Sequence, residues 1–208
     1  MSDGPKQPRT ETRSNVRATA KAYDDDDARR YVETRRRGPR RRFARSFEVR
    51  RLLGAAPDAG TVLDVPAGGG RFDGLRGLVT CDVSHGMATQ CSERGFRALR
   101  GDAFALPFGD DAFELLLSLR FLHHFESTDR VRALAEFRRV ATAAVVTYFG
   151  DTGFKAWRRA RSTKERTRRG VSKQAFASDC VAAGWTVERD FAVLPGFSEQ
   201  RIVVLLRA

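Results

Sequence analysis

VLDVPAGGGRF, residues 62–72, joins a short aliphatic run to a cluster of glycines. The run over 61–65 is aliphatic and β-branched, which predicts a buried strand. Gly68 and Gly70 lack a Cβ, so their backbone N–H groups can approach a ligand that a side chain would push away. The segment therefore predicts a strand followed by a ligand-binding turn.

Further short apolar runs follow this strand, and helix-like segments separate several of them. An amphipathic helix is expected over 128–140, and another over 86–94. Strands that alternate with helices indicate βαβ crossovers and a parallel sheet covered on both faces. The four additional strands predicted in this part of the chain are 78–83, 96–102, 113–119 and 143–149.

The end of the chain follows a different pattern. After a predicted helix over 172–183 come two strand-like runs, 185–194 and 201–208, separated only by PGFSEQ. Six residues are too few for a right-handed crossover, so these two strands should be antiparallel. The expected fold class is α/β: a Rossmann-like, seven-stranded, mostly parallel sheet with helices on both faces and an antiparallel C-terminal hairpin.

The net charge of +12 over 208 residues is concentrated in two segments. Residues 28–51 contain 11 arginines and two acids, and residues 155–169 contain eight basic residues and one acid. The other 169 residues together carry −4. The basicity therefore belongs to two segments and not to the α/β body.

Three regions are expected. Residues 1–21 are polar, lack apolar periodicity and read as a disordered leader without a secretory signal. Residues 22–54 form a basic helical segment, with helices predicted over 28–37 and 41–53, and residues 55–208 form the α/β domain with the basic insert 155–169. No apolar stretch is long enough to span a membrane, and three cysteines without a paired motif favour reduced thiols, so a cytoplasmic setting is expected.

Four motifs occur in an order that resembles the class I S-adenosylmethionine-dependent methyltransferases. They are VLDVPAGGGRF (62–72), CDVSHGM (81–87), RGDAFALPFGDDAFELLLS (100–118) and LHHF (122–125), and the resemblance covers roughly residues 45–208. In detail the chain looks like the small stand-alone enzymes that methylate quinones and lipids. The resemblance implies that S-adenosylmethionine is the cofactor and methyl transfer the activity.

The resemblance also implies a set of cofactor-binding residues at the strand ends. Asp64 would accept from the cofactor's ammonium or a turn amide, Asp82 from both ribose hydroxyls, and Asp102 from the adenine amine. The glycine turn would face the methionine part, and the end of the fourth strand would line the cleft where the methyl group emerges. The complete set is Asp64, Pro66, Ala67, Gly68, Gly70, Asp82, Val83, Asp102, Ala103, Ser118 and Leu119.

Each feature taken alone has a simpler interpretation, as a turn or a helix cap. A dinucleotide-binding turn would need a third glycine where Asp73 stands. Two features depart from the methyltransferase pattern. Pro66 occupies the place where glycine is commonest, and only about seven residues separate Gly70 from the second strand, so the first helix should shrink to a turn or two.

The catalytic residues are less clearly indicated. His123 and His124 follow the fourth strand, where one of them could act as a base or simply pack against the fold. Arg120 could bind an anionic substrate or cap a helix. The three histidines and three cysteines lack the spacing of a metal site.

The basic segments leave the acceptor open. They could bind a small or lipid-like anionic acceptor, with Arg120 and Trp157 at its rim, or an anionic membrane surface as a peripheral contact. They could bind RNA, with Phe43, Phe47 and Trp157 available for stacking. They could also be a solvated face. A non-catalytic binding module that retains the fold is the remaining alternative, and the oligomeric state is not indicated.

Overall fold

The computed structural model describes residues 25–36, 38–152 and 170–207. The predicted leader 1–21, the basic insert 155–169 and Trp157 lie outside these residues. Among the described helices, none has the length and hydropathy that a membrane span requires.

Seven strands form one sheet in the order β3-β2-β1-β4-β5-β7-β6. Their bounds are β1 Val62–Asp64, β2 Leu78–Asp82, β3 Arg97–Arg100, β4 Phe113–Ser118, β5 Ala141–Phe149, β6 Trp185–Ala192 and β7 Gln200–Arg207. The first five strands pair in parallel, while β7 is antiparallel to both β5 and β6. The predicted fold class and the antiparallel hairpin are therefore confirmed.

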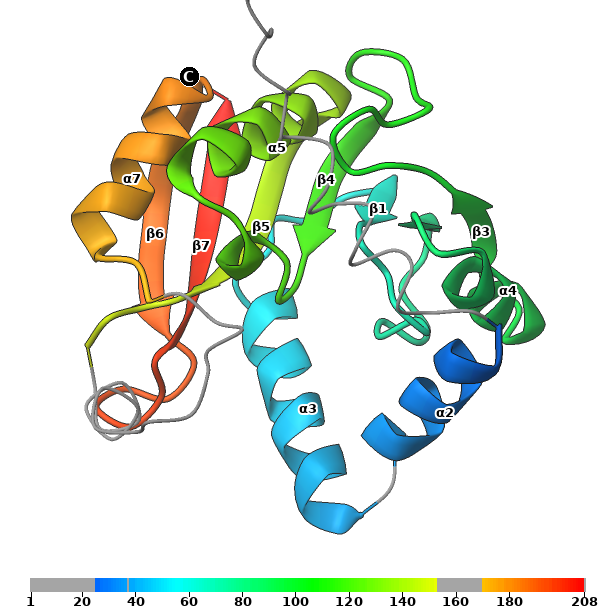
Figure 1. The fold of residues 1–208 in the computed structure, drawn as a ribbon. Coiled ribbons are helices and arrows are strands. Elements are labelled where there is room, and N and C mark those ends of the chain that lie inside the picture. Colours follow the sequence, from blue (N-terminus) through cyan, green and yellow to red (C-terminus); the bar gives the residue numbers. More distant parts are fainter. Residues whose placement is uncertain (1–24, 37, 153–169, 208) are drawn as a thin grey trace, which may run out of the picture.

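The helices lie on the faces and at one end of this sheet (Figure 1). Their bounds are α2 Asp25–Arg36, α3 Pro39–Leu53, α4 His85–Glu93, the short 3₁₀ helix η2 Leu122–His124, α5 Ser127–Val140 and α7 Lys173–Ala182. Helices α2 and α3 lie beyond the carboxyl ends of the parallel strands, the edge at which open α/β sheets bind ligands. Each predicted helix among these is present, with ends shifted by up to three residues.

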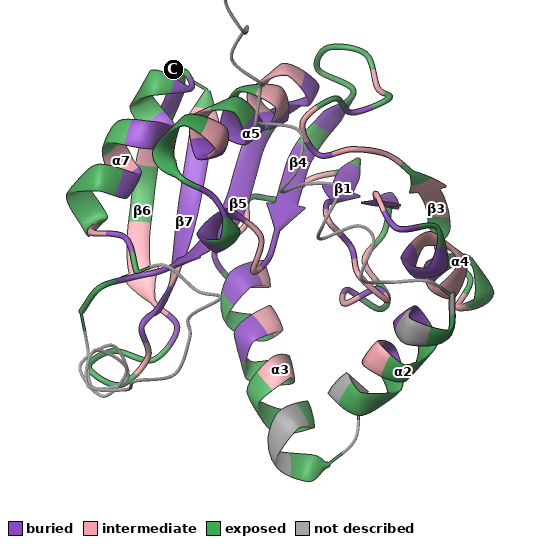
Figure 2. Ribbon diagram, viewed as in Figure 1, coloured by how far each residue is buried: buried purple, intermediate pink, exposed green. Residues whose placement is uncertain are grey.

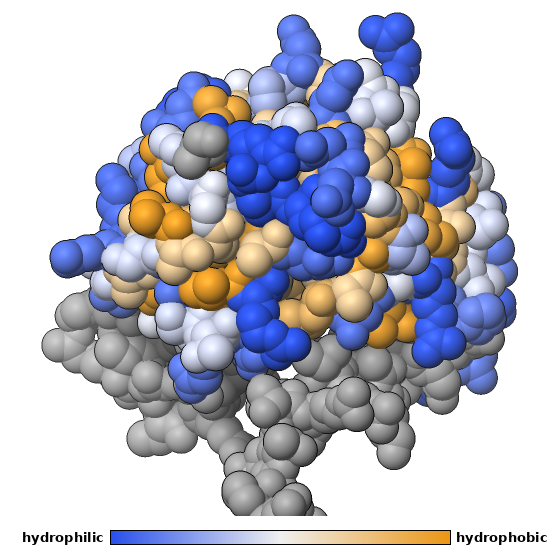
Figure 3. Space-filling model, turned by 90° about the horizontal axis from the view of Figure 1, so that it is seen from above, coloured by the Kyte–Doolittle hydropathy of each residue, from blue (hydrophilic) through white to orange (hydrophobic). Residues whose placement is uncertain are grey.

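Two hydrophobic cores lie on opposite faces of the sheet. Successive side chains of a strand point to opposite faces, and β4 shows this directly: Leu116 joins one core, while Leu115 and Leu117 join the other. Helices α5 and α7 cover the first core, and the end of α3 reaches the second through the fully buried Leu52. The central strands are buried along most of their length (Figure 2). The opposite end of the sheet, at the amino ends of the strands, presents a mixture of hydrophilic and hydrophobic surface (Figure 3).

The segment between β1 and β2 corrects one prediction. Instead of a helix of one or two turns, residues 66–77 contain only turns. Gly70 and Gly74 have φ values of +74° and +78°, in the left-handed region that a right-handed helix excludes. The glycines that make the turn therefore also remove the helix.

Helix α3 corrects a second prediction. The apolar residues among 41–53 predict a broken apolar face on this helix that includes Phe43 and Phe47, but these two side chains are 74% and 36% exposed. Only the carboxyl-terminal half of α3 packs on the sheet, because the helix extends past the edge of the core (Figure 1). The two phenylalanines thus face solvent.

Candidate active site

The glycine turn lies at the carboxyl ends of β1, β2 and β4. Asp64 is the last residue of β1, beside Leu117 of β4, and Asp82 is the last residue of β2. Gly68 has a φ of +55° and Gly70 of +74°, so both need the conformational freedom of glycine. The structure therefore brings the first two predicted acids and the turn together.

Asp64 is fully buried, and neither of its carboxylate oxygens accepts a hydrogen bond from the described residues. Burial raises the pKa of Asp64 to about 7; Arg71 opposes this rise, and the neighbouring Asp82 adds to it. Buried polar atoms normally have partners, and those that lack one call for an explanation. A cationic ligand at the turn would provide the missing donors.

Asp82 organises the turn. Its Oδ2 accepts from the Gly68 backbone N–H at 2.8 Å and its Oδ1 from the Ser84 N–H at 3.0 Å. Burial raises the pKa of Asp82, and these two backbone donors oppose the rise. Each carboxylate oxygen keeps a second lone pair, so Asp82 can still accept from a ligand hydroxyl.

The remaining predicted residues follow at neighbouring strand ends. The Asp102 Oδ1 accepts from the Phe104 N–H at 3.0 Å, and Ala103 beside it is buried. Ser118 ends β4 with a fully buried hydroxyl that has no hydrogen-bond partner among the described residues, and buried Leu119 follows it.

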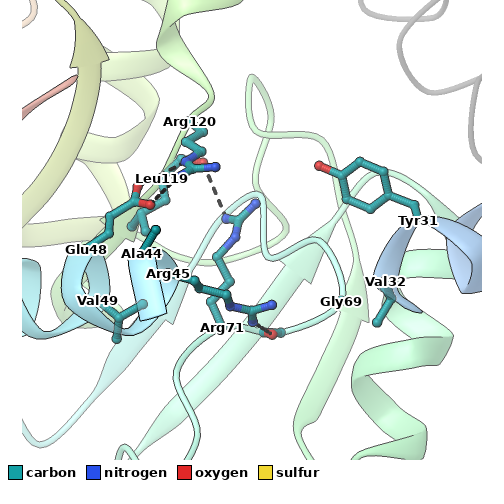
Figure 4. Close-up of a pocket in the computed structure, with 11 residues that line it drawn as sticks. Tyr31, Val32, Ala44, Arg45, Glu48, Val49, Gly69, Arg71, Leu119 and Arg120 are labelled. Atoms are coloured by element: carbon teal, nitrogen blue, oxygen red, sulfur yellow. Dashed lines mark hydrogen bonds and ion pairs between the residues drawn. The ribbon is translucent and has the colours of Figure 1, made fainter. Parts of the chain in front are cut away.

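A cavity of about 420 Å³ opens between the glycine turn and the two N-terminal helices. Figure 4 shows Tyr31 and Val32 of α2 on one side, facing the side chains of α3 across the opening. The cavity is lined by Tyr31, Val32, Ala44, Arg45, Glu48, Val49, Gly69, Gly70, Arg71, Leu119 and Arg120. Of the predicted site residues, Gly70, Leu119 and Arg120 line it, whereas the three acids Asp64, Asp82 and Asp102 do not.

The cavity wall carries three guanidinium groups and one carboxylate. Arg45 donates to the Gly70 carbonyl at 2.7 Å, and Arg71 donates to the Leu119 carbonyl at 3.4 Å. Arg120 pairs with Glu48, and the Glu48 carboxylate also accepts from Gln200. The charges of the lining side chains sum to +2, which favours an anionic occupant.

The two histidines do not line this cavity. His123 is buried, with its ring edge-on to Phe149 at 4.7 Å between centroids, and His124 is exposed. Arg120 is not a helix cap: its side chain is ion-paired and its backbone N–H donates to the Thr147 hydroxyl at 2.8 Å.

Sequence reasoning missed Tyr31, Arg45, Glu48 and Arg71 as lining residues. One available signal was the isolation of Glu48, one of only two acids among 11 arginines over 28–51. Which arginine of such a run faces inward depends on how the helix docks, so Arg45 could not be singled out.

The fold and the turn define a class. The strand order, the antiparallel seventh strand and a glycine turn flanked by strand-end acids are those of class I S-adenosylmethionine-dependent methyltransferases. Residues 63–147 match the family model described as "Methyltransferase domain". This part of the chain thus matches a methyltransferase domain, and the class that it resembles takes its methyl group from S-adenosylmethionine.

Individual proteins agree with this assignment. The chain is 32% identical over 103 residues to the tRNA (carboxymethyluridine(34)-5-O)-methyltransferase of Arabidopsis thaliana, covering 48% of this chain and 26% of that protein. It is 35% identical over 122 residues to a putative methyltransferase of Encephalitozoon cuniculi, covering 57% and 54%. The chain therefore spans about half or less of these relatives. The fold matches the magnesium protoporphyrin IX methyltransferase of Synechocystis with bound SAH at a TM-score of 0.68 and 12% identity, over 93% of this chain and 100% of that one. The expected likeness to quinone and lipid enzymes is not confirmed by these relatives.

Proposed function

We propose that this protein transfers a methyl group from S-adenosylmethionine to an anionic oxygen acceptor carried on RNA. The observation that carries the proposal is the cavity beside the glycine turn, whose wall has three guanidinium groups and one ion-paired carboxylate.

The described residues fit the cofactor. The buried Asp64 carboxylate has two oxygens without hydrogen-bond partners among the described residues, and these would accept from an ammonium group. Asp82 would accept from the ribose, while Asp102 and the Ala103 N–H would contact the adenine. The further proposed contacts are Pro66, Ala67, Gly68, Gly70, Val83, Ser118 and Leu119. When bound, the cofactor supplies a methyl group activated on a sulfonium.

A carboxylate acceptor agrees with the chemistry of the cavity. A carboxylate is already deprotonated near neutral pH, so its attack on a methyl group needs no general base, whereas an amine or phenol often does. Among the described residues that line the cavity there is no free carboxylate base, because Glu48, the one acid, is held by Arg120 and Gln200. Guanidinium groups bind carboxylates with two donors, so Arg45 and Arg71 would orient the acceptor, beside the ion-paired Arg120.

The proposal that the acceptor is RNA is supported by the relatives. The matched proteins of Arabidopsis and Xenopus tropicalis are both named as tRNA (carboxymethyluridine(34)-5-O)-methyltransferases. Because the chain spans only 26% and 15% of these two proteins, the RNA acceptor is a proposal for this chain. A carboxymethyl group on a pyrimidine would present a carboxylate to the arginines.

A small anionic acceptor is the second candidate. The cavity volume of about 420 Å³ would hold a small acid without any nucleic acid around it. A fold retained without catalysis would instead bind cofactor or partner and show no turnover.

The test compares two arginines of α3. Arg45 lines the cavity, whereas Arg42 is exposed on the same helix. Methylation of bulk tRNA and of small carboxylic acids would be followed with labelled S-adenosylmethionine. Arg45→Gln should raise the KM for the RNA acceptor about tenfold, and Arg42→Gln should change it much less. Methylation of small acids alone would favour the second candidate, and the absence of any turnover in a protein that binds cofactor would reject the proposal.

A further inference from the structure

The outward face of α3 carries two exposed aromatic rings. Phe43 and Phe47 are one helical turn apart, with ring centroids 6.5 Å apart and ring planes at 21°. Large apolar side chains that gather on a protein surface often mark a site of interaction. The helix does not use this pair to pack on the sheet, since this half of α3 is largely exposed (Figure 2).

Two arginines lie on the same face. At 3.6 residues per turn, Phe43, Phe47, Arg50 and Arg51 fall within an arc of roughly 100°. Arg50 and Arg51 are exposed, and the Arg51 guanidinium lies 5.1 Å from the centre of the Phe191 ring of β6. We call these four α3 residues the Phe–Arg strip.

The opposite face of α3 points into the protein. Arg45 and Glu48 line the cavity, and Leu52 is fully buried. One helix therefore presents one face to the cavity and the Phe–Arg strip to solvent. A polymer bound along the strip would therefore be separated from the cavity by the width of one helix, about 10–12 Å.

We propose that the Phe–Arg strip binds single-stranded RNA, with bases stacked on Phe43 and Phe47 and phosphates held by Arg50 and Arg51. Aromatic rings beside positive charge are the combination that binds unpaired nucleotides with little sequence preference. This inference rests on the proposed RNA acceptor and deepens it, because it assigns the surface that holds the RNA outside the cavity.

Charge and composition favour RNA over two other occupants. The basic segment 155–169 carries a net charge of +7 and would be repelled by the strip. A helix that lies on a membrane presents a broad apolar face, whereas this face has two phenylalanines followed by two arginines. Polyanionic RNA complements the charges and uses the rings.

Fluorescence anisotropy with a labelled single-stranded RNA tests the strip. The variant Phe43→Ala/Phe47→Ala should weaken binding at least about tenfold, since each stacked base contributes measurably to affinity. Phe43→Tyr/Phe47→Tyr keeps the rings and should retain the affinity. Phe197→Ala removes a 48% exposed phenylalanine elsewhere and is the matched control. Calorimetric affinity for S-adenosylmethionine should be the same in all four proteins.

The outcomes separate this inference from the proposed function. Unchanged RNA affinity in Phe43→Ala/Phe47→Ala, with RNA still methylated, would overturn the strip alone. Failure of the wild-type protein to bind RNA would overturn both. If the variant lost binding to anionic phospholipid vesicles but not to RNA, the strip would be a membrane contact and the inference wrong.

Discussion

Glu48 of α3 and Arg120, which lies two residues beyond β4 and 72 positions further along the chain, form an ion pair through two hydrogen bonds. Glu48 is almost fully buried, and Gln200 of β7 donates to the same carboxylate. The pair joins the basic N-terminal region to the segment that follows the central strand β4. It therefore holds α3, which forms one wall of the cavity, against the sheet (Figure 4).

The first prediction concerns this pair. Glu48→Gln should leave Arg120 without its counter-charge and destabilise the protein by about 1–3 kcal/mol, since the Arg120 side chain stays one-third exposed to water. The melting temperature should fall by roughly 2–12 °C. Thermal unfolding measures this change in melting temperature. The control is Glu33→Gln, because Glu33 is an exposed acid on α2. Equal melting temperatures for the two variants would show that the pair contributes nothing.

The second prediction uses the raised pKa of Asp64. Burial raises this pKa from 3.8 to about 7, so the folded protein holds a proton that the unfolded chain has released. The stabilisation that this proton provides should therefore be fully present near pH 4. It should decrease as the pH rises to about 7 and be absent above that pH. The upper limit of this effect is about 4 kcal/mol.

Asp64→Asn isolates this effect. The cofactor-free variant should melt above wild type at pH 8 and close to it near pH 4, although it should bind S-adenosylmethionine more weakly. Asp58→Asn, at an exposed position, should follow the wild-type pH profile. Parallel profiles for Asp64→Asn and wild type would mean that Asp64 does not titrate in this range.

The third prediction concerns the contact between α2 and the glycine turn. A Cβ at Gly69 would overlap the Val32 side chain of α2, so Gly69→Ala should destabilise the protein by about 1–3 kcal/mol. Val32 packs in a small cluster with Ala28 and Met87. Val32→Ala removes the two methyl groups of this side chain and should relieve the overlap. Thermal melts should show that the double variant Gly69→Ala/Val32→Ala loses less stability than the sum of the losses in the two single variants.

Gly109→Ala is the control for this series, since a Cβ there has no atom within 4 Å. Simple additivity of Gly69→Ala and Val32→Ala would contradict the proposed contact.

The sequence predicted most of the fold because its signals are local. Aliphatic runs, glycine positions and a six-residue hairpin connection are sufficient to specify strands, turns and the antiparallel end. The missing helix after β1 was less predictable, because it depends on which glycines adopt left-handed backbone conformations. The site was predicted in part: Asp64 and Asp82 do converge on the glycine turn, as strand-end acids should. The cavity was not, because Arg45, Glu48 and Tyr31 reach it only through the docking of two helices onto the sheet.

The most direct test of the account is the chemical nature of the methylated product. Bulk tRNA would be incubated with the protein and S-adenosylmethionine labelled in the methyl group, and the RNA then exposed to mild alkali. The account predicts incorporation that alkali releases as methanol, because methyl esters of carboxylates hydrolyse under these conditions. Label that stays on the RNA after alkali, or an absence of label in RNA despite cofactor binding, would contradict it.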